Sequence, residues 1–95
     1  TASWFPGSTD LSAALESENV VAAVDATGCP VAGENPQRIT LTGKGVTSAS
    51  SVILLIFGEA KKVVFDTAIK SSVQEKPIKY AIDKLGPRLT VVWAA

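Results

Sequence analysis

The chain contains no histidine and no methionine, and only one cysteine, Cys29, among its 95 residues. Histidine is the commonest general base near neutral pH, so a Ser-His-Asp or Cys-His catalytic site cannot be assembled from this chain alone. A single thiol excludes an intrachain disulfide, and without histidine it also excludes a Cys/His zinc cluster. The remaining candidates for proton transfer are the carboxylates, the lysines, Tyr80 and Cys29.

Excess charge and long apolar segments are also missing. Nine basic and nine acidic residues cancel, so the chain has no net field that would attract nucleic acid or an anionic membrane, and any anion site must be local. The longest purely apolar run is Val52–Phe57, far short of the about 20 residues that a membrane-spanning helix needs. The N-terminus lacks the basic segment and apolar core of a signal peptide. We expect no nucleic-acid or membrane partner, and a reducing compartment, the cytoplasm.

The order of hydrophobic patterns predicts one α/β domain, residues 1–95. A hydrophobic content of 46% favours a packed core over disorder. In chain order, the patterns predict a helix through about Glu18, strands over 20–26 and 38–42, a short helix over 46–51, a strand over 52–57, a helix over 59–73, a helical turn near 78–82 and a strand over 89–93. Alternating strands and helices predict a mainly parallel sheet of about four strands with helical cover.

The segment Val52–Phe57 is the clearest strand. It is apolar on both faces, which is typical of a central strand in a parallel sheet. A sheet of about four strands leaves at least one edge exposed, and we expect a missing part of the protein or a second copy of the chain to cover it.

Gly58-x-x-Lys61 joins this strand to the following helix. Backbone N–H groups at a helix start carry partial positive charge, so a phosphate placed there would gain several donors and the charge of Lys61. The alternative is an ordinary solvated lysine, which is the commoner situation when these residues are considered alone.

Three other motifs have structural explanations. Arg38 shares a strand face with two threonines and could reach a phosphate, but an ion pair that braces the sheet edge is the favoured interpretation. Gly43-Lys44-Gly45 lacks the spacing of a nucleotide-binding P-loop, so we interpret it as a turn. Cys29 has no base beside it in the sequence and is interpreted as a passive thiol.

Four stretches, in order, resemble the 6-phosphogluconolactonase family. They are Thr-Ala-Ser-Trp-Phe-Pro-Gly-Ser at 1–8, Pro-Gln-Arg-Ile-Thr-Leu-Thr at 36–42, the strand and Gly-Glu-Ala-Lys motif at 52–61, and Leu-Thr-Val-Val-Trp-Ala-Ala at 89–95. The first is similar to the family segment T-A-S-L-F-P-G-S, which follows Asp-Gly-His. The missing initial methionine agrees with a fragment or processed product.

The resemblance implies a partial three-layer α/β sandwich, the C-terminal portion of a lactonase that hydrolyses 6-phosphogluconolactone to 6-phosphogluconate in the pentose phosphate pathway. The catalytic histidine would stand immediately before Thr1, outside the chain. Lys61 and Gly58 would hold the substrate phosphate and Arg38 would assist, while Thr1 and Ser3 would line the site unless this end is frayed. No metal or cofactor is required. We expect the chain alone to be inactive and to associate with the missing N-terminal half or with a second copy.

Some residues depart from the family pattern and keep alternatives open. Lys44 and residues 47–50 stand where the family has a proline and an N-A-A-R-like stretch, whose asparagine lies near the sugar-phosphate site in relatives. The aspartate of the family's C-terminal stretch is replaced by Trp93 or is absent. One alternative is a glucosamine-6-phosphate isomerase/deaminase, which lacks the T-A-S-x-F-P-G signature. Others are a sugar-phosphate-sensing domain without catalysis, which would require an upstream helix-turn-helix, and an α/β domain with no sugar site.

Overall fold

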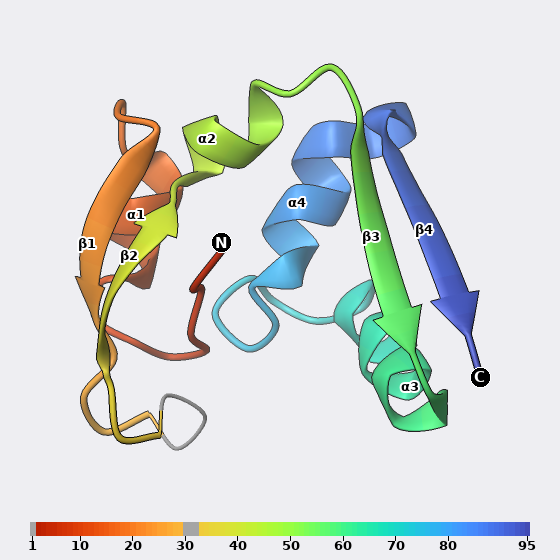
Figure 1. Ribbon diagram of the computed structural model, residues 1–95, viewed down its shortest axis with the longest axis horizontal. Coiled ribbons are helices and arrows are strands. Elements are labelled where there is room, and N and C mark those ends of the chain that lie inside the picture. The colour runs from red at the N-terminus through yellow and green to blue at the C-terminus, as the bar shows by residue number, and fades with distance from the viewer. Residues whose placement is uncertain (1, 30–32) are drawn as a thin grey trace.

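The computed structural model describes residues 2–29 and 33–95, so the site-lining prediction for Thr1 lies outside the described residues. The elements, labelled in Figure 1, are α1 (Leu11–Glu16), β1 (Val21–Asp25), β2 (Gln37–Leu41), α2 (Gly43–Thr47), β3 (Val52–Phe57), α3 (Glu59–Ala68), α4 (Ile78–Leu85), the 3₁₀ turn η2 (Gly86–Arg88) and β4 (Leu89–Ala94). The α/β class is confirmed, and most predicted elements lie within a few residues of their expected bounds.

The strands form two pairs and not one sheet. β1 and β2 are antiparallel, with Val21 opposite Leu41, whereas β3 and β4 are parallel, with Val52 opposite Leu89. The loop after β1 brings the chain straight back as an antiparallel partner, while a parallel pair needs a longer crossover, here made by α3 and α4. The expectation of one mainly parallel sheet is therefore corrected: among the described residues only the β3–β4 pair is parallel.

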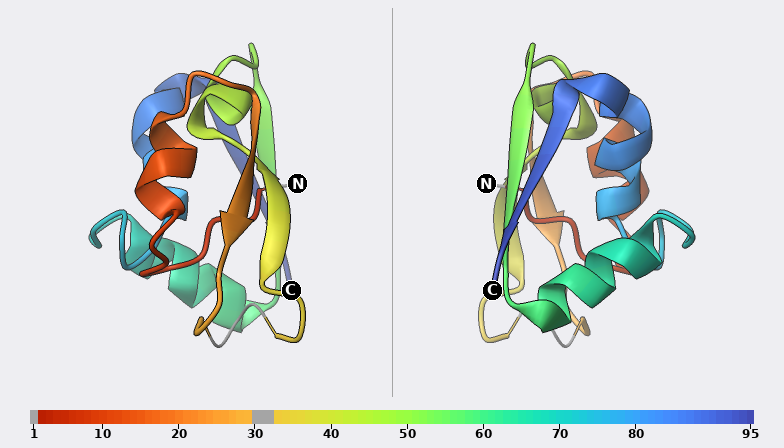
Figure 2. Two further views of the ribbon diagram at one scale, coloured as in Figure 1. Left: turned by 90° about the vertical axis from the view of Figure 1, so that its left-hand side faces the viewer. Right: turned by 90° about the vertical axis from the view of Figure 1, so that its right-hand side faces the viewer.

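Helices α1, α3 and α4 lie on one side of the strands. Figure 2 shows α1, α3 and α4 on the same side in both views, with both strand pairs along the other side. The core lies between these two layers and consists mainly of small and aliphatic side chains, namely Leu11, Ala14, Leu15, Val24, Ala26, Ile56, Ala68, Ala81 and Leu85. The described residues thus supply two layers of the expected three. None of their helices is long and apolar enough to cross a membrane.

The β1–β2 pair buries hydroxyls and exposes an apolar side chain. Thr40 and Thr42 are buried, whereas Ile39 is 75% exposed. The hydroxyls are satisfied internally: Thr40 Oγ1 accepts from the Ser3 amide at 2.7 Å, and Thr42 Oγ1 donates to the Asn19 carbonyl. Because their polar groups are paired, these threonines can face the core, and the alternation of the strand turns Ile39 outward.

Helix α2 begins earlier than the sequence predicts. The turn expected at Gly43-Lys44-Gly45 is its first turn, and Thr42 caps it by accepting a hydrogen bond from the Gly45 amide at 3.0 Å. Two glycines disfavour a helix by propensity, but close packing requires them. A Cβ on Gly43 would lie 2.1 Å from the Leu15 carbonyl oxygen, and one on Gly45 would lie 2.4 Å from that of Val20.

Candidate phosphate site

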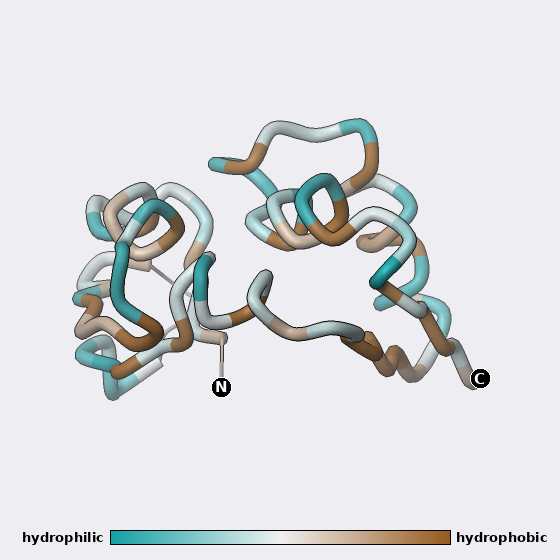
Figure 3. Tube along the Cα trace, turned by 90° about the horizontal axis from the view of Figure 1, so that it is seen from above, coloured by the Kyte–Doolittle hydropathy of each residue, from teal (hydrophilic) through white to brown (hydrophobic). Residues whose placement is uncertain are grey.

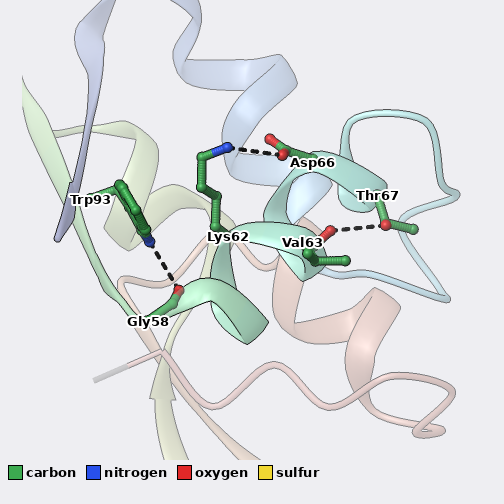
Figure 4. A network of polar contacts seen from close by, with 6 residues as sticks. All are labelled: Gly58, Lys62, Val63, Asp66, Thr67 and Trp93. Atoms are coloured by element: carbon green, nitrogen blue, oxygen red, sulfur yellow. Dashed lines mark hydrogen bonds and ion pairs between the residues drawn. The ribbon is translucent and has the colours of Figure 1, made fainter. Parts of the chain in front are cut away.

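The turn from β3 into α3 is held by its neighbour strand. Gly58 adopts a φ of +87°, a conformation that favours glycine. Its amide donates to the Ala94 carbonyl at 2.8 Å, and its carbonyl accepts from Trp93 Nε1 at 2.9 Å. Figure 4 shows the Trp93 indole reaching from β4 to Gly58. The start of α3 is therefore anchored to β4 through both the N–H and the carbonyl of Gly58.

This anchoring decides which amides are available to an anion. The Gly58 amide is already used, and the Lys62 amide donates to the Gly58 carbonyl at 3.3 Å. The amides of Glu59, Ala60 and Lys61 occupy the first turn of α3, where no intrahelical acceptor exists. Gly58 thus shapes the turn, and the available donors come from the next three residues.

The Lys61 side chain extends from the same first turn of α3. It is exposed, and within residues 2–29 and 33–95 its ammonium makes no hydrogen bond or ion pair. It borders a hollow of about 320 Å³, here called the lysine hollow, whose other lining residues are apolar: Leu54, Ile56, Ala60, Val64, Phe65 and Ile78. An uncommitted positive charge at an apolar hollow, next to unused N–H donors, can attract an anionic group.

The N-terminal segment borders an adjoining hollow. This central hollow, about 670 Å³, lies between the two strand pairs and is lined by Ala2 and Trp4 on one side and by Ile53 on the other. It shares Leu54, Val64 and Ile78 with the lysine hollow. Residues that follow the expected catalytic histidine therefore border one hollow, and the expected phosphate-binding lysine borders the hollow next to it.

Two other predicted site residues lie outside these hollows. Ser3 lines neither hollow and is tied to β2 through the Thr40 hydroxyl. Arg38 lines neither hollow and is half-buried; its Nε donates to the Asn35 carbonyl at 2.5 Å, and its guanidinium lies 5.5 Å from the centre of the Phe5 ring. These contacts agree better with a structural role for Arg38 than with phosphate binding.

Sequence reasoning missed the side chains that support the helix start. In the sequence Trp93 was noted only as a departure from the family pattern, yet its indole N–H donates to the Gly58 carbonyl. Lys62 lies over the Trp93 ring, with Nζ 5.7 Å from the centroid, and also pairs with Asp66 at 3.6 Å (Figure 4). An indole at the end of β4, in register with the end of β3, was the signal that could have indicated this support.

The loop around Cys29 forms a separate pocket of about 210 Å³. The Cys29 Sγ lies 3.9 Å from the Pro6 carbonyl oxygen, and nearby Thr27 donates to Asp25 through both its hydroxyl and its amide. These hydrogen bonds lower the pKa of the Asp25 carboxyl below its ordinary value. Asp25 therefore stays ionised and is unsuited to act as a general acid. Among the described side chains there is no cluster of His, Cys, Asp and Glu that could hold a metal ion.

The fold and site together define an α/β domain with a candidate anion site at the carboxyl end of a parallel strand. The model of the family described as glucosamine-6-phosphate isomerases/6-phosphogluconolactonase matches residues 1–93. The chain belongs to this family, which confirms the resemblance seen in the sequence.

Curated relatives and a solved structure are named as lactonases. The chain is 45% identical over 96 aligned residues to the 6-phosphogluconolactonase of Xylella fastidiosa (strain Temecula1), covering 100% of this chain and 40% of the relative. It is 33% identical over 94 residues to that of Neisseria meningitidis serogroup A, covering 99% and 39%. A crystal structure of a 6-phosphogluconolactonase from Shewanella baltica matches with a TM-score of 0.85 and 29% identity, over 99% of this chain and 39% of that one.

The chain therefore spans about two fifths of the length of these relatives. Its assignment as the C-terminal portion of a longer domain stays a prediction.

Proposed function

We propose that the chain is the phosphate-binding part of a 6-phosphogluconolactonase. The observation that carries this proposal is the free ammonium of Lys61, which extends from the same first turn of α3 as the unused amides. The names of the relatives supply the substrate: a lactone that carries a phosphate far from its reacting carbonyl. A dianionic phosphate would bind the helix start and Lys61, leaving the sugar ring toward the side chains that line both hollows, Leu54, Val64 and Ile78.

The chemistry in this proposal needs a base from outside the chain. A histidine just before Thr1 would take a proton from water, and the water oxygen would attack the lactone carbonyl. The ring C–O bond would then break, and the ring oxygen would take up a proton to leave a hydroxyl and a carboxylic acid. The described residues would hold the substrate by its phosphate, so their contribution is to fix the distance between the lactone carbonyl and that base.

Replacing Lys61 in the longer protein tests the proposal. Lys61→Ala removes one charge-assisted hydrogen bond to phosphate, which is worth roughly 1.5–3 kcal/mol. We expect the KM for 6-phosphogluconolactone to rise about tenfold or more, measured by the acid released in a pH-stat.

Lys70→Ala is the matched control, because Lys70 is an exposed lysine just beyond the far end of α3. It should leave the KM unchanged. Equal kinetic constants for Lys61→Ala and the unsubstituted protein would remove Lys61 from the site and contradict the proposal.

A further inference from the structure

We propose that Thr40, supported by Trp4, is a positioning residue for the lactonase reaction: its buried hydroxyl holds the segment that follows the catalytic base against the end of β2. The inference rests on the proposed function, since the base is the histidine expected before Thr1. Thr40 acts through the backbone of that segment and not through contact with the reacting atoms.

The Thr40 hydroxyl binds the backbone of the N-terminal segment. Thr40 is 1% exposed, and its Oγ1 accepts a hydrogen bond from the Ser3 amide at 2.7 Å. The same hydroxyl donates to the Leu41 carbonyl at 2.8 Å, which leaves its lone pairs for Ser3. A hydroxyl that donates on one side is polarised into a better acceptor on the other. This contact joins residues 37 apart in the chain, so it depends on the folded domain.

Trp4 adds a second tie at the same point. Its Nε1 donates to the Leu41 carbonyl at 2.9 Å, and this carbonyl also accepts from Thr40. The Trp4 ring packs edge to face against Tyr80 of α4, with the ring centroids 5.9 Å apart. A leucine, the residue of the family segment at this position, has no side-chain N–H to donate. Two consecutive residues, Ser3 and Trp4, are thus bound to the end of β2.

The bound segment borders the space where the base is expected. Ala2, Trp4 and Leu41 line the central hollow. Seen from above, the described chain starts between the two strand pairs, on the side opposite the helices (Figure 3). The expected histidine precedes Ser3 by three residues, so an extended chain would place it at most about 11 Å from the bound amide. A displacement of this segment would therefore displace the base.

The two sides of the proposed site hold different groups. Lys61 and the start of α3 would hold the substrate phosphate, whereas Thr40 and Trp4 would set the distance from the base to the attacking water and the lactone carbonyl. Loss of the Thr40 hydroxyl should therefore lower kcat and leave KM unchanged, while loss of the Lys61 ammonium raises KM.

Thr40→Val in the longer protein tests this assignment. It removes the hydroxyl and keeps the branched shape of the side chain. We expect kcat for 6-phosphogluconolactone to fall about tenfold or more with KM unchanged, measured well below the Tm, because small misplacements of a reacting group have large effects on rate. Thr40→Ser, which keeps the hydroxyl, should retain most of kcat. An unchanged kcat in Thr40→Val overturns the proposal.

Thr42→Val is the matched control, because Thr42 is also buried. Its hydroxyl binds the Asn19 carbonyl and the Gly45 amide, neither of which belongs to the N-terminal segment. This variant should lower the Tm and leave kcat unchanged. If Thr42→Val lowers kcat as much as Thr40→Val does, the loss reflects general destabilisation, and the proposal is overturned.

Trp4→Phe decides the matter if Thr40→Val does not fold. It removes the indole N–H and keeps an aromatic ring beside Tyr80. A severalfold fall in kcat at unchanged KM would support the proposal, and an unchanged kcat would overturn it.

The same measurements separate this inference from the proposed function. A longer protein without lactonase turnover would overturn both. An active protein in which Lys61→Ala raises KM, while Thr40→Val retains full kcat, would keep the proposed function and overturn this inference alone.

Discussion

At the scale of residues, the start of α3 depends on Gly58 and Trp93. Gly58 supplies the backbone conformation, and Trp93 binds the carbonyl of that residue from the neighbouring strand. Lys61 then projects from a helix start whose position is fixed by β4. Phosphate affinity should therefore be sensitive to Trp93, although Trp93 itself is not expected to contact the phosphate.

Trp93→Phe tests this dependence. It removes the indole N–H and so one hydrogen bond, which should lower the free energy of unfolding by about 1 kcal/mol. In the longer protein it should also weaken 6-phosphogluconate binding, as measured by calorimetry. The control is Thr67→Val, which also removes a 2.9 Å bond to a backbone carbonyl, that of Val63, further along α3. If both variants weaken binding equally, Trp93 does not position the phosphate site.

At the scale of elements, α2 shows packing overriding local propensity. Its two glycines allow the helix to approach the carbonyl oxygens of Leu15 and Val20 more closely than any other residue permits. These contacts join α2 to α1 and to the residue before β1.

Gly43→Ala should therefore destabilise the chain even though alanine is the better helix former. The added Cβ overpacks a backbone contact, at a cost of about 1–3 kcal/mol measured by urea unfolding. Lys44→Ala, at an exposed position of the same helix, should be neutral or slightly stabilising. Gly43→Ala with unchanged stability would contradict the close approach.

The sequence predicts elements better than it predicts their partners. Val52–Phe57 is found as predicted because its continuous apolar run carries its own signal, and the helix after it begins at Glu59 as expected. The pattern in 20–26 predicts a strand but not its antiparallel partner, since strand pairing depends on distant residues. A short helix was predicted over 46–51, but its start at Gly43 was not, because the close approach that requires glycine there is to the distant carbonyl of Leu15.

The candidate site divides in the same way. Gly58-x-x-Lys61 is local, and the sequence places it correctly at the junction of strand and helix. The Trp93 support is not local, because it joins residues 35 apart in the chain. For Arg38, the structural role that the sequence favoured agrees with its contacts to Asn35 and Phe5.

At the scale of the whole molecule, the chain combines a candidate phosphate site with no histidine and an uncovered apolar face. In the presence of the 95 residues alone, we therefore expect 6-phosphogluconolactone to be hydrolysed no faster than its spontaneous rate in water. A pH-stat assay against the spontaneous rate measures this. Turnover well above that rate would show that a base within the chain, such as a carboxylate, suffices.

The most direct test of the account is a titration of the longer protein with 6-phosphogluconate, the stable product, followed through backbone amide NMR signals. The account predicts that the largest shift changes fall on Glu59, Ala60 and Lys61, and that Lys61→Ala raises the 6-phosphogluconate concentration needed to produce them about tenfold or more, while Lys70→Ala leaves it unchanged. Saturable binding of 6-phosphogluconate that leaves these three amides unshifted would contradict the assignment of the α3 start as the phosphate site.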